Sequence, residues 1–238
     1  MSAPEEKKEY PRPSLTADVV ALLLDESGLR VLFIRRGNAP FEGEWALPGG
    51  FCEPTETVVQ AAARELTEET GVGDVRLEEL GSFSTPGRDP RGWVVTVAHL
   101  GFLPAERAGQ AVGADDASEA AWLRLVIDEG GTYRLEHAGA PVTKLAFDHL
   151  EVVALAVRRL RERVAELAFA LIPQTFSLDE AQRAFEAILG APLDPAAFGA
   201  ELLREGLVRD APPGASSPRY HAVPVRPDLR FLGAAGKK

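Results

Sequence analysis

Cysteine is almost absent from this chain, which has only Cys52 among its 238 residues. A single cysteine excludes an intrachain disulfide and leaves no partners for a cysteine-based zinc site. This usage is typical of a reducing compartment, and we expect Cys52 to be a small, semi-buried hydrophobic residue.

Long hydrophobic runs are also missing, and no apolar stretch is long enough to span a bilayer. The N-terminus is charged from Glu5 to Glu9 and has no apolar signal-peptide core. We therefore expect a soluble, cytoplasmic protein with no membrane partner, whose residues 1–14 form a flexible tail.

The chain has no excess of basic charge, since its formal net charge is −10. That balance argues against a surface coated for nucleic-acid binding. Residues 167–238 carry as many basic as acidic residues, so the whole acidic excess lies in residues 1–166. We expect two modest domains of different electrostatic character.

The first part of the chain has the patterning of a mixed α/β domain. Two apolar runs, residues 15–24 and 29–35, flank a short polar turn and predict a β-hairpin. A helix is expected to begin near Thr55 and to end at Gly71. Further strands are predicted at residues 75–84, 92–103 and 119–126.

The predicted helix carries three acids on one face. Glu65, Glu68 and Glu69 stand at positions i, i+3 and i+4, so their carboxylates lie close enough to repel one another. A hard cation such as Mg²⁺ or Mn²⁺ would turn this repulsion into a binding site. The alternative is a solvated acidic face, which is what most such clusters are.

The residues around these acids favour the metal site. Residues 50–72 read GFCEPTETVVQAAARELTEETGV, in which Gly50, Glu56, Arg64, Leu66, Gly71 and Val72 accompany the three acids at fixed spacing. This string resembles the Nudix signature at every fixed position. The resemblance implies an α/β/α sandwich with a mixed sheet and metal ligands from Glu65, Glu68, Glu69 and the carbonyl of Gly49.

The same resemblance implies hydrolysis of a nucleoside diphosphate derivative. Glu65, Glu68 and Arg64 would form the catalytic group, with Arg64 also holding the loop and helix in register. The residue that deprotonates the attacking water is undecided: it is either Glu65 or an acid of a later loop, for which Asp115, Asp116 and Glu119 are candidates.

Two flanking stretches resemble the ADP-ribose-handling branch of the family, namely VLFIRRGNAPFEGEWALPGGF and SFSTPGRDPRGWVVTVAHL. Arg36, Arg88 and Arg91, with Gly50, are therefore candidate substrate-binding residues, because guanidinium groups suit phosphate. They could equally be ordinary turn arginines. Phe83 and Trp93 could stack an adenine or could belong to the core.

The rest of the chain has the order of a winged helix-turn-helix domain. Apolar residues recur at helical spacing over residues 147–164, which predicts a connecting helix within residues 147–166. Ser177 and Glu180 form a capping box before a helix over residues 178–189, and Asp194 with Pro195 opens another. Strands at residues 207–209 and 220–225 complete a domain of residues 167–235.

A Nudix domain of residues 15–146 followed by this winged helix resembles the Nudix-related transcriptional regulators of NAD metabolism. The resemblance implies a homodimer that binds ADP-ribose in one domain and DNA in the other. However, the expected recognition helix, residues 195–205, contains only Glu201, Arg204 and Glu205 as charges. A helix among phosphates should be basic, so DNA binding is disfavoured, although Arg204, Arg209 and Arg219 remain candidate contacts.

Three hypotheses follow. The preferred one is a metal-dependent pyrophosphohydrolase acting on ADP-ribose or a related compound. The alternative is an ADP-ribose-sensing DNA-binding repressor, and the third is a winged helix that serves only for dimerisation or interaction.

Overall fold

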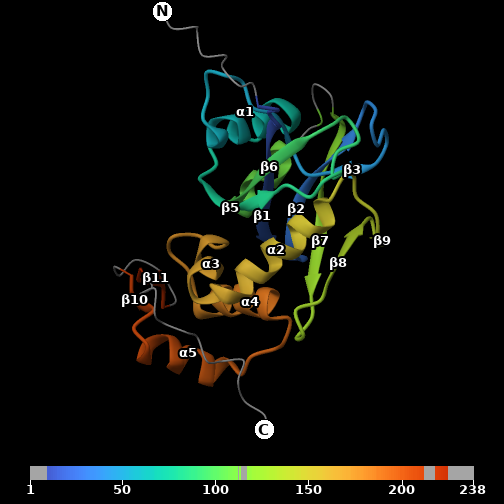
Figure 1. Cartoon of the computed structure of the whole chain (residues 1–238). Coiled ribbons are helices and arrows are strands. Elements are labelled where there is room, and N and C mark those ends of the chain that lie inside the picture. The colour runs from blue at the N-terminus through green and yellow to red at the C-terminus, as the bar shows by residue number, and fades with distance from the viewer. Residues whose placement is uncertain (1–9, 112, 114–116, 212–217, 225–238) are drawn as a thin grey trace, which may run out of the picture.

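The computed structural model describes residues 10–111, 113, 117–211 and 218–224. It contains a large mixed sheet flanked by helices, and a smaller helical unit with a two-stranded sheet below it (Figure 1). None of the helices in the described ranges is long and apolar enough to cross a membrane.

The large sheet has the strand order β5-β6-β1-β2-β7-β8-β9. Its strands are β1 (Ser14–Asp25), β2 (Gly28–Arg36), β5 (Leu77–Phe83), β6 (Val94–Phe102), β7 (Ala117–Ile127), β8 (Tyr133–His137) and β9 (Ala140–Val142). The short strands β3 (Trp45–Ala46) and β4 (Gly49–Phe51) pair with β2 and β1. Since β1 and β6 are parallel and the other neighbours are antiparallel, the sheet is mixed, as predicted.

Strand β1 explains why helices cover both faces of the sheet. Its alternate residues Val19 and Ala21 pack in one buried cluster with Leu66 of helix α1 (Val58–Thr70). The intervening residues Val20 and Leu22 belong to another cluster that contains helix α2 (His149–Glu162). A strand buried on both faces reads as a continuous apolar run, because successive side chains point to opposite sides.

The remaining elements form the winged helix: α3 (Val164–Ala170), α4 (Leu178–Leu189), α5 (Pro195–Arg204), β10 (Val208–Asp210) and β11 (Tyr220–Ala222). The Ser177–Glu180 capping box and the Asp194 cap before Pro195 are both present, as predicted. A 3₁₀ helix, η1 (Ala105–Gln110), lies between β6 and β7.

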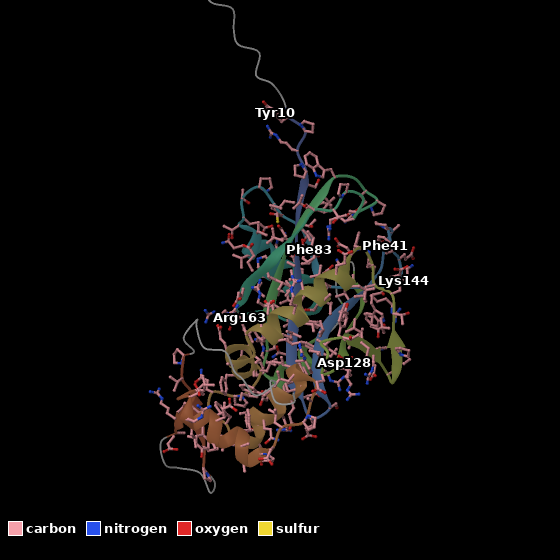
Figure 2. All side chains as sticks on the ribbon, turned by 60° about the horizontal axis from the view of Figure 1, so that its bottom comes forward. Tyr10, Phe41, Phe83, Asp128, Lys144 and Arg163 are labelled. Carbon is pink, nitrogen blue, oxygen red and sulfur yellow. The ribbon has the colours of Figure 1, made fainter. Side chains whose placement is uncertain are left out.

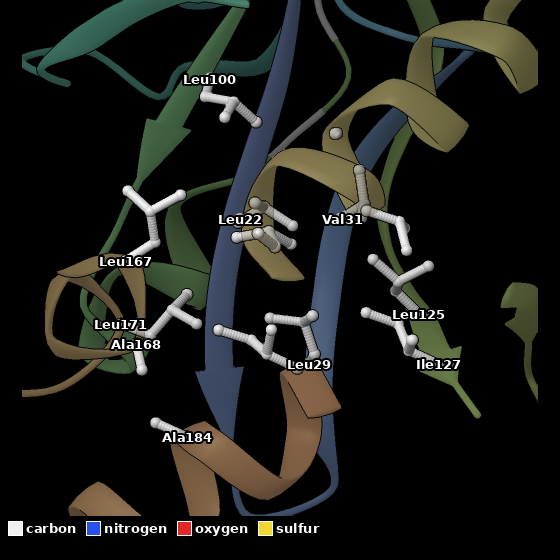
Figure 3. Packing of buried hydrophobic residues seen from close by; sticks show 14 of the residues in the cluster. Leu22, Leu29, Val31, Leu100, Leu125, Ile127, Leu167, Ala168, Leu171 and Ala184 are labelled. Carbon is white, nitrogen blue, oxygen red and sulfur yellow. The ribbon is translucent and has the colours of Figure 1, made fainter. Parts of the chain in front are cut away.

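The two units share one core. The buried cluster that contains Leu22 and Leu29 continues through Leu167 and Leu171 of the α3 region to Ala184 of α4 (Figure 3). It also includes Phe176, Phe185 and Phe198. The winged helix is therefore packed directly against one end of the sheet.

Two predicted helix boundaries were wrong. Helix α1 begins after Thr57, so Thr57 and not Thr55 is the N-cap. The Thr57 side chain accepts the backbone N–H of Gln60, and the Gln60 side chain accepts the backbone N–H of Thr57, which together form a capping box. The predicted helix of residues 147–164 begins after Asp148 and breaks at Arg163, where α3 starts. Both differences arise because apolar periodicity locates a helix better than its ends.

Candidate functional site

A polar cavity of about 300 Å³ opens beside α1 on the large sheet. It collects residues from β1, the end of β2, the β4 loop, α1, the β5–β6 loop and the start of α2. The polar residues that line it are Thr16, Asp18, Arg36, Asn38, Arg64, Glu65, Glu68, Glu69, Arg88, Asp89, Arg91 and His149, and Gly49, Gly50, Phe51 and Phe147 are among the others. The predicted acids and arginines thus surround one space.

Arg64 connects the acids of the predicted signature. Its guanidinium donates to Glu56 at 2.7 Å, to Glu65 at 2.8 Å and to Glu68 at 2.9 Å. It also donates to the carbonyl of Phe51 at 3.1 Å, which fastens α1 to the β4 loop. Arg64 therefore holds the loop and the helix together, and these bonds lower the pKa of Glu56 and raise the pKa of Arg64.

Glu69 is 7% exposed and accepts a hydrogen bond from the backbone N–H of Gly49 at 2.9 Å. Burial, followed by the negative charges of Glu65 and Asp18, raises the pKa of Glu69 to about 8, although the Gly49 hydrogen bond and Arg36 oppose this rise. Burial also raises the pKa of Glu65. In both carboxyl groups the cost of burying the charge therefore exceeds the stabilisation that nearby cations and hydrogen bonds give to the charged form.

The two glycines of the β4 loop let the backbone approach these acids. A Cβ atom at Gly50 would lie 2.4 Å from an oxygen of Glu65, and one at Gly49 would lie 2.3 Å from the carbonyl oxygen of Ala17. Gly49 also has a φ of 156°. A side chain at either position would push the loop away from α1.

The acids fit a hard cation in donor type, since oxygen ligands suit Mg²⁺ and Mn²⁺. In the described part of the chain, however, no three acidic, histidine or cysteine side chains are placed closely enough to enclose a metal ion. Glu65 and Glu68 are bonded to Arg64 instead. Metal binding would require both carboxylates to exchange these bonds for bonds to the ion.

The three predicted phosphate-binding arginines line the cavity but differ in their partners. Arg88 is 4% exposed and binds both carboxylate oxygens of Asp148, at 2.8 and 2.6 Å. Arg91 pairs with Asp89 at 2.6 Å and is 40% exposed. The Nε of Arg36 donates to the carbonyl of Pro40 at 2.7 Å. Arg36 and Arg91 are therefore better placed than Arg88 to meet a ligand.

Sequence analysis missed a buried polar group on the cavity wall. Asp18 is 6% exposed and accepts a hydrogen bond from Thr96 at 2.6 Å, while His149 lies 3.7 Å from its other oxygen. The Nδ1 of His149 accepts the N–H of Leu47 at 2.9 Å, and burial lowers the pKa of this histidine. The one available signal was an acid within an apolar strand.

The aromatic residues at the cavity also differ from the predicted pair. Trp93 is 56% exposed and Phe83 packs against the main core, and neither is among the cavity-lining residues of the described chain. Phe51 and Phe147 line the cavity instead. Stacking of an adenine by Phe83 or Trp93 has no support in this arrangement.

The predicted late-loop acids give no base in the described structure. Asp115 and Asp116 lie outside the described residues. Glu119 is in β7, where it pairs with Arg35 at 2.9 Å, and it is not among the described cavity-lining residues. Its place therefore gives no support for a role as base.

The candidate DNA contacts lie on α5 and the β10–β11 hairpin. Arg204 is 68% exposed and pairs with Glu205 at 2.6 Å. Arg209 is exposed on β10. Arg219 pairs with Glu180 at 3.2 Å and donates to the carbonyl of Thr175 at 2.5 Å, so it fastens the hairpin to the start of α4.

Both parts of the chain match known domains. Residues 14–128 match the NUDIX domain, and residues 168–214 match the NrtR DNA-binding winged helix domain. The chain belongs to the Nudix family, in the group whose members carry an NrtR winged helix. The predicted fold and family resemblance are confirmed.

Particular relatives include a regulator and an enzyme. The chain is 34% identical, over 86% of its length and 78% of the relative's, to the ADPR responsive transcriptional repressor NtrR of Acinetobacter baylyi. It is 36% identical, over 60% of its length and 73% of the relative's, to an ADP-ribose pyrophosphatase of Methanocaldococcus jannaschii.

Solved structures extend the likeness to both domains. A MutT/nudix family protein from Enterococcus faecalis has a TM-score of 0.77 and 34% identity, with 92% of this chain and 90% of that chain covered. Shewanella oneidensis NrtR complexed with a 27mer DNA has a TM-score of 0.65 and 26% identity, with 88% of this chain and 93% of that chain covered.

These findings correct the ranking of the functional hypotheses. The expectation that a recognition helix without a basic excess disfavours DNA binding goes against the match to a DNA-binding winged helix domain. The charge of one helix was an insufficient guide, because phosphate contacts can come from any part of such a domain. The comparisons favour the regulator over the hydrolase that the sequence analysis preferred.

Proposed function

We propose that this protein is an ADP-ribose-responsive, DNA-binding transcriptional regulator. The observation that carries the proposal is the pairing of a polar, arginine-lined Nudix cavity with a winged helix packed on the same core. The 34% identity to an ADPR responsive repressor over most of both chains supports it.

Ligand recognition is assigned to the cavity of the Nudix domain. Arg36 and Arg91 offer guanidinium groups to a diphosphate, and the ring face of Phe51 offers a surface for a base or ribose. Arg91 already lies 4.8 Å from the ring centre of Phe51, so charge and aromatic surface meet at one place.

Calorimetric titration with ADP-ribose tests this part. We expect saturable binding, and a loss of affinity of roughly tenfold or more in Arg36→Ala, because a charge-assisted hydrogen bond contributes about 1.5–3 kcal/mol. Arg134→Ala is the matched control, since Arg134 lies on β8 with a 59% exposed side chain. No binding by the wild-type protein would refute ligand sensing.

DNA binding is assigned to the winged helix, with α5 as the helix that enters the major groove. Selection from a pool of random duplexes at low salt, followed by titration of the enriched duplex, tests this assignment. We expect Arg204→Ala in α5, and Arg209→Ala in the neighbouring strand β10, each to weaken DNA binding and to reduce by about one the slope of log affinity against log salt concentration. Failure to enrich any duplex would refute the DNA-binding role.

Hydrolysis of ADP-ribose is the second candidate function, which the intact signature of Glu65, Glu68 and Glu69 at one cavity favours. These acids and the Gly49 carbonyl would hold Mg²⁺ or Mn²⁺, which polarises the diphosphate and lowers the pKa of an attacking water. Arg36 and Arg91 would orient the diphosphate, and Glu65 or Glu68 would take the proton of the water.

An assay of AMP release with Mg²⁺ and with Mn²⁺ tests this candidate. Turnover that is lost in Glu69→Gln, with ADP-ribose binding retained, would establish a metal-dependent hydrolase. Saturable binding of ADP-ribose without turnover would refute the hydrolase and leave the ligand-sensing regulator as the function.

We further propose that the protein is a homodimer, because a symmetric regulator reads two half-sites of DNA. Light scattering of the full-length chain measures this directly, and a monomeric mass at micromolar concentration would refute it.

A further inference from the structure

Phe147, which lines the cavity, has an uncommon backbone conformation. Its φ is +54°, which is uncommon for a bulky residue. The guanidinium carbons of Arg36 and Arg91 lie 5.0 and 5.4 Å from its ring centre, and the ring also contacts His149 at 5.3 Å. The ring therefore contacts the two arginines that are best placed to meet a ligand.

The next residue, Asp148, is where α2 begins, yet its carboxylate makes no capping hydrogen bond to that helix. Both oxygens instead bind Arg88, a third arginine of the cavity wall. The side chains of Phe147 and Asp148, the two residues before α2, thus contact arginines of the cavity, while the backbone carbonyl of Asp148 accepts the N–H groups of Glu151 and Val152 in the helix. A diphosphate would compete for the same guanidinium groups.

The other end of α2 contacts the winged helix. Arg161 donates to the carbonyls of Asp128 and Glu129, which follow β7, and to the carbonyl of Leu189 at the end of α4. Gly190, which ends α4, lies close to the backbone of Asp128. A Cβ atom at position 190 would lie 2.3 Å from the carbonyl carbon of Asp128. Figure 2 shows Asp128 where the sheet meets the helices of the winged helix.

Helix α2 therefore joins the cavity to the domain junction. Its 14 residues span about 21 Å at 1.5 Å per residue, with arginine-mediated contacts at both ends. Val152, Val153, Ala156, Val157 and Leu160 of the helix are fully or almost fully buried, so the helix moves as a unit rather than by bending.

We propose that Phe147 and Asp148 are the contacts through which an occupied cavity repositions α2, and with it the winged helix. A diphosphate that takes Arg36 and Arg91 as partners, and competes with Asp148 for Arg88, removes the cationic partners of both side chains. The ring of Phe147 is then held by Phe41 and His149 but no longer by the arginines, so Phe147 can leave its left-handed conformation, and α2 shifts against the carbonyls that Arg161 holds. The inference rests on the proposed function, of which it describes the regulation.

Hydrogen exchange of the full-length chain, with and without saturating ADP-ribose, tests the proposal. In the wild-type protein we expect protection of α1 together with a several-fold change in exchange at residues 159–163 and 186–190. In Phe147→Ala and in the isosteric Asp148→Asn, α1 should still be protected at saturation, while the change at the two distant segments should fall below about twofold.

Trp93→Ala is the matched control, because Trp93 is an exposed aromatic residue two positions after Arg91 but outside the described cavity lining. It should keep the full wild-type response. The affinity for the selected duplex gives a second readout: saturating ADP-ribose should change it roughly tenfold in wild type, within the usual range for coupled sites, and hardly at all in the two variants.

The outcomes separate the two proposals. A full distant response in both variants, or protection of α1 without any distant change in wild type, would overturn the role of Phe147 and Asp148 while leaving ADP-ribose binding intact. Absence of α1 protection in wild type would refute the proposed ligand, and the coupling with it.

Discussion

Replacing Glu69 by Gln should stabilise the metal-free protein at alkaline pH. The carboxyl is 7% exposed and its pKa is raised to about 8 from a usual 4.5, chiefly by burial. Between these two values the folded protein keeps a proton that the unfolded chain has lost. The folded state therefore binds more protons, and its stability falls as pH rises through this window.

The magnitude follows from the same pKa values. Each pH unit within the window costs about 1.4 kcal/mol, so ionisation of Glu69 should cost roughly 4–5 kcal/mol above pH 8. This is a large fraction of the ordinary stability of a domain. Gln can still accept the N–H of Gly49 and carries no charge, so the variant should avoid that cost.

Urea unfolding of both proteins in EDTA, from pH 5 to pH 9, measures the difference. The two free energies of unfolding should be similar near pH 5, should diverge by about 1.4 kcal/mol per pH unit up to about pH 8, and should differ by a constant amount above that pH. Glu68→Gln is the matched control, because Glu68 lies on the same helix with a 47% exposed side chain. Parallel curves for wild type and Glu69→Gln would refute the reasoning.

Three further predictions concern stability, each measured by chemical unfolding. Gly190→Ala should destabilise by more than about 2 kcal/mol, because its φ is +73° and a Cβ would collide with backbone; Gly206→Ala, at φ +67° in open space, should cost only about 1 kcal/mol. Arg88→Ala should cost about 3–5 kcal/mol by leaving the carboxylate of Asp148 buried and unpaired, and a loss below 1 kcal/mol would contradict that view. Ser177→Ala should cost about 1 kcal/mol through loss of the α4 cap, whereas an unchanged midpoint would show that the capping box adds nothing.

Much of the fold could be predicted from the sequence because its signals are local. Each such signal involves residues that are close together along the chain. Examples are the apolar run of β1, the caps of α4 and α5, and the spacing of Glu65, Glu68 and Glu69. Short strands such as β3, β4 and β9 were missed, since two or three residues carry no periodicity.

The sequence by itself determined the family, the order of the domains and the helix that presents the acids. Tertiary structure decided which residues share the cavity with that helix, since Asp18 meets Thr96 across 78 positions, Arg88 meets Asp148 across 60, and Leu47 meets His149 across 102. It also decided the pKa of Glu69, because desolvation depends on every element that covers the carboxyl. Helical and strand periodicity describe neighbours along the chain, whereas burial and charge describe neighbours in space.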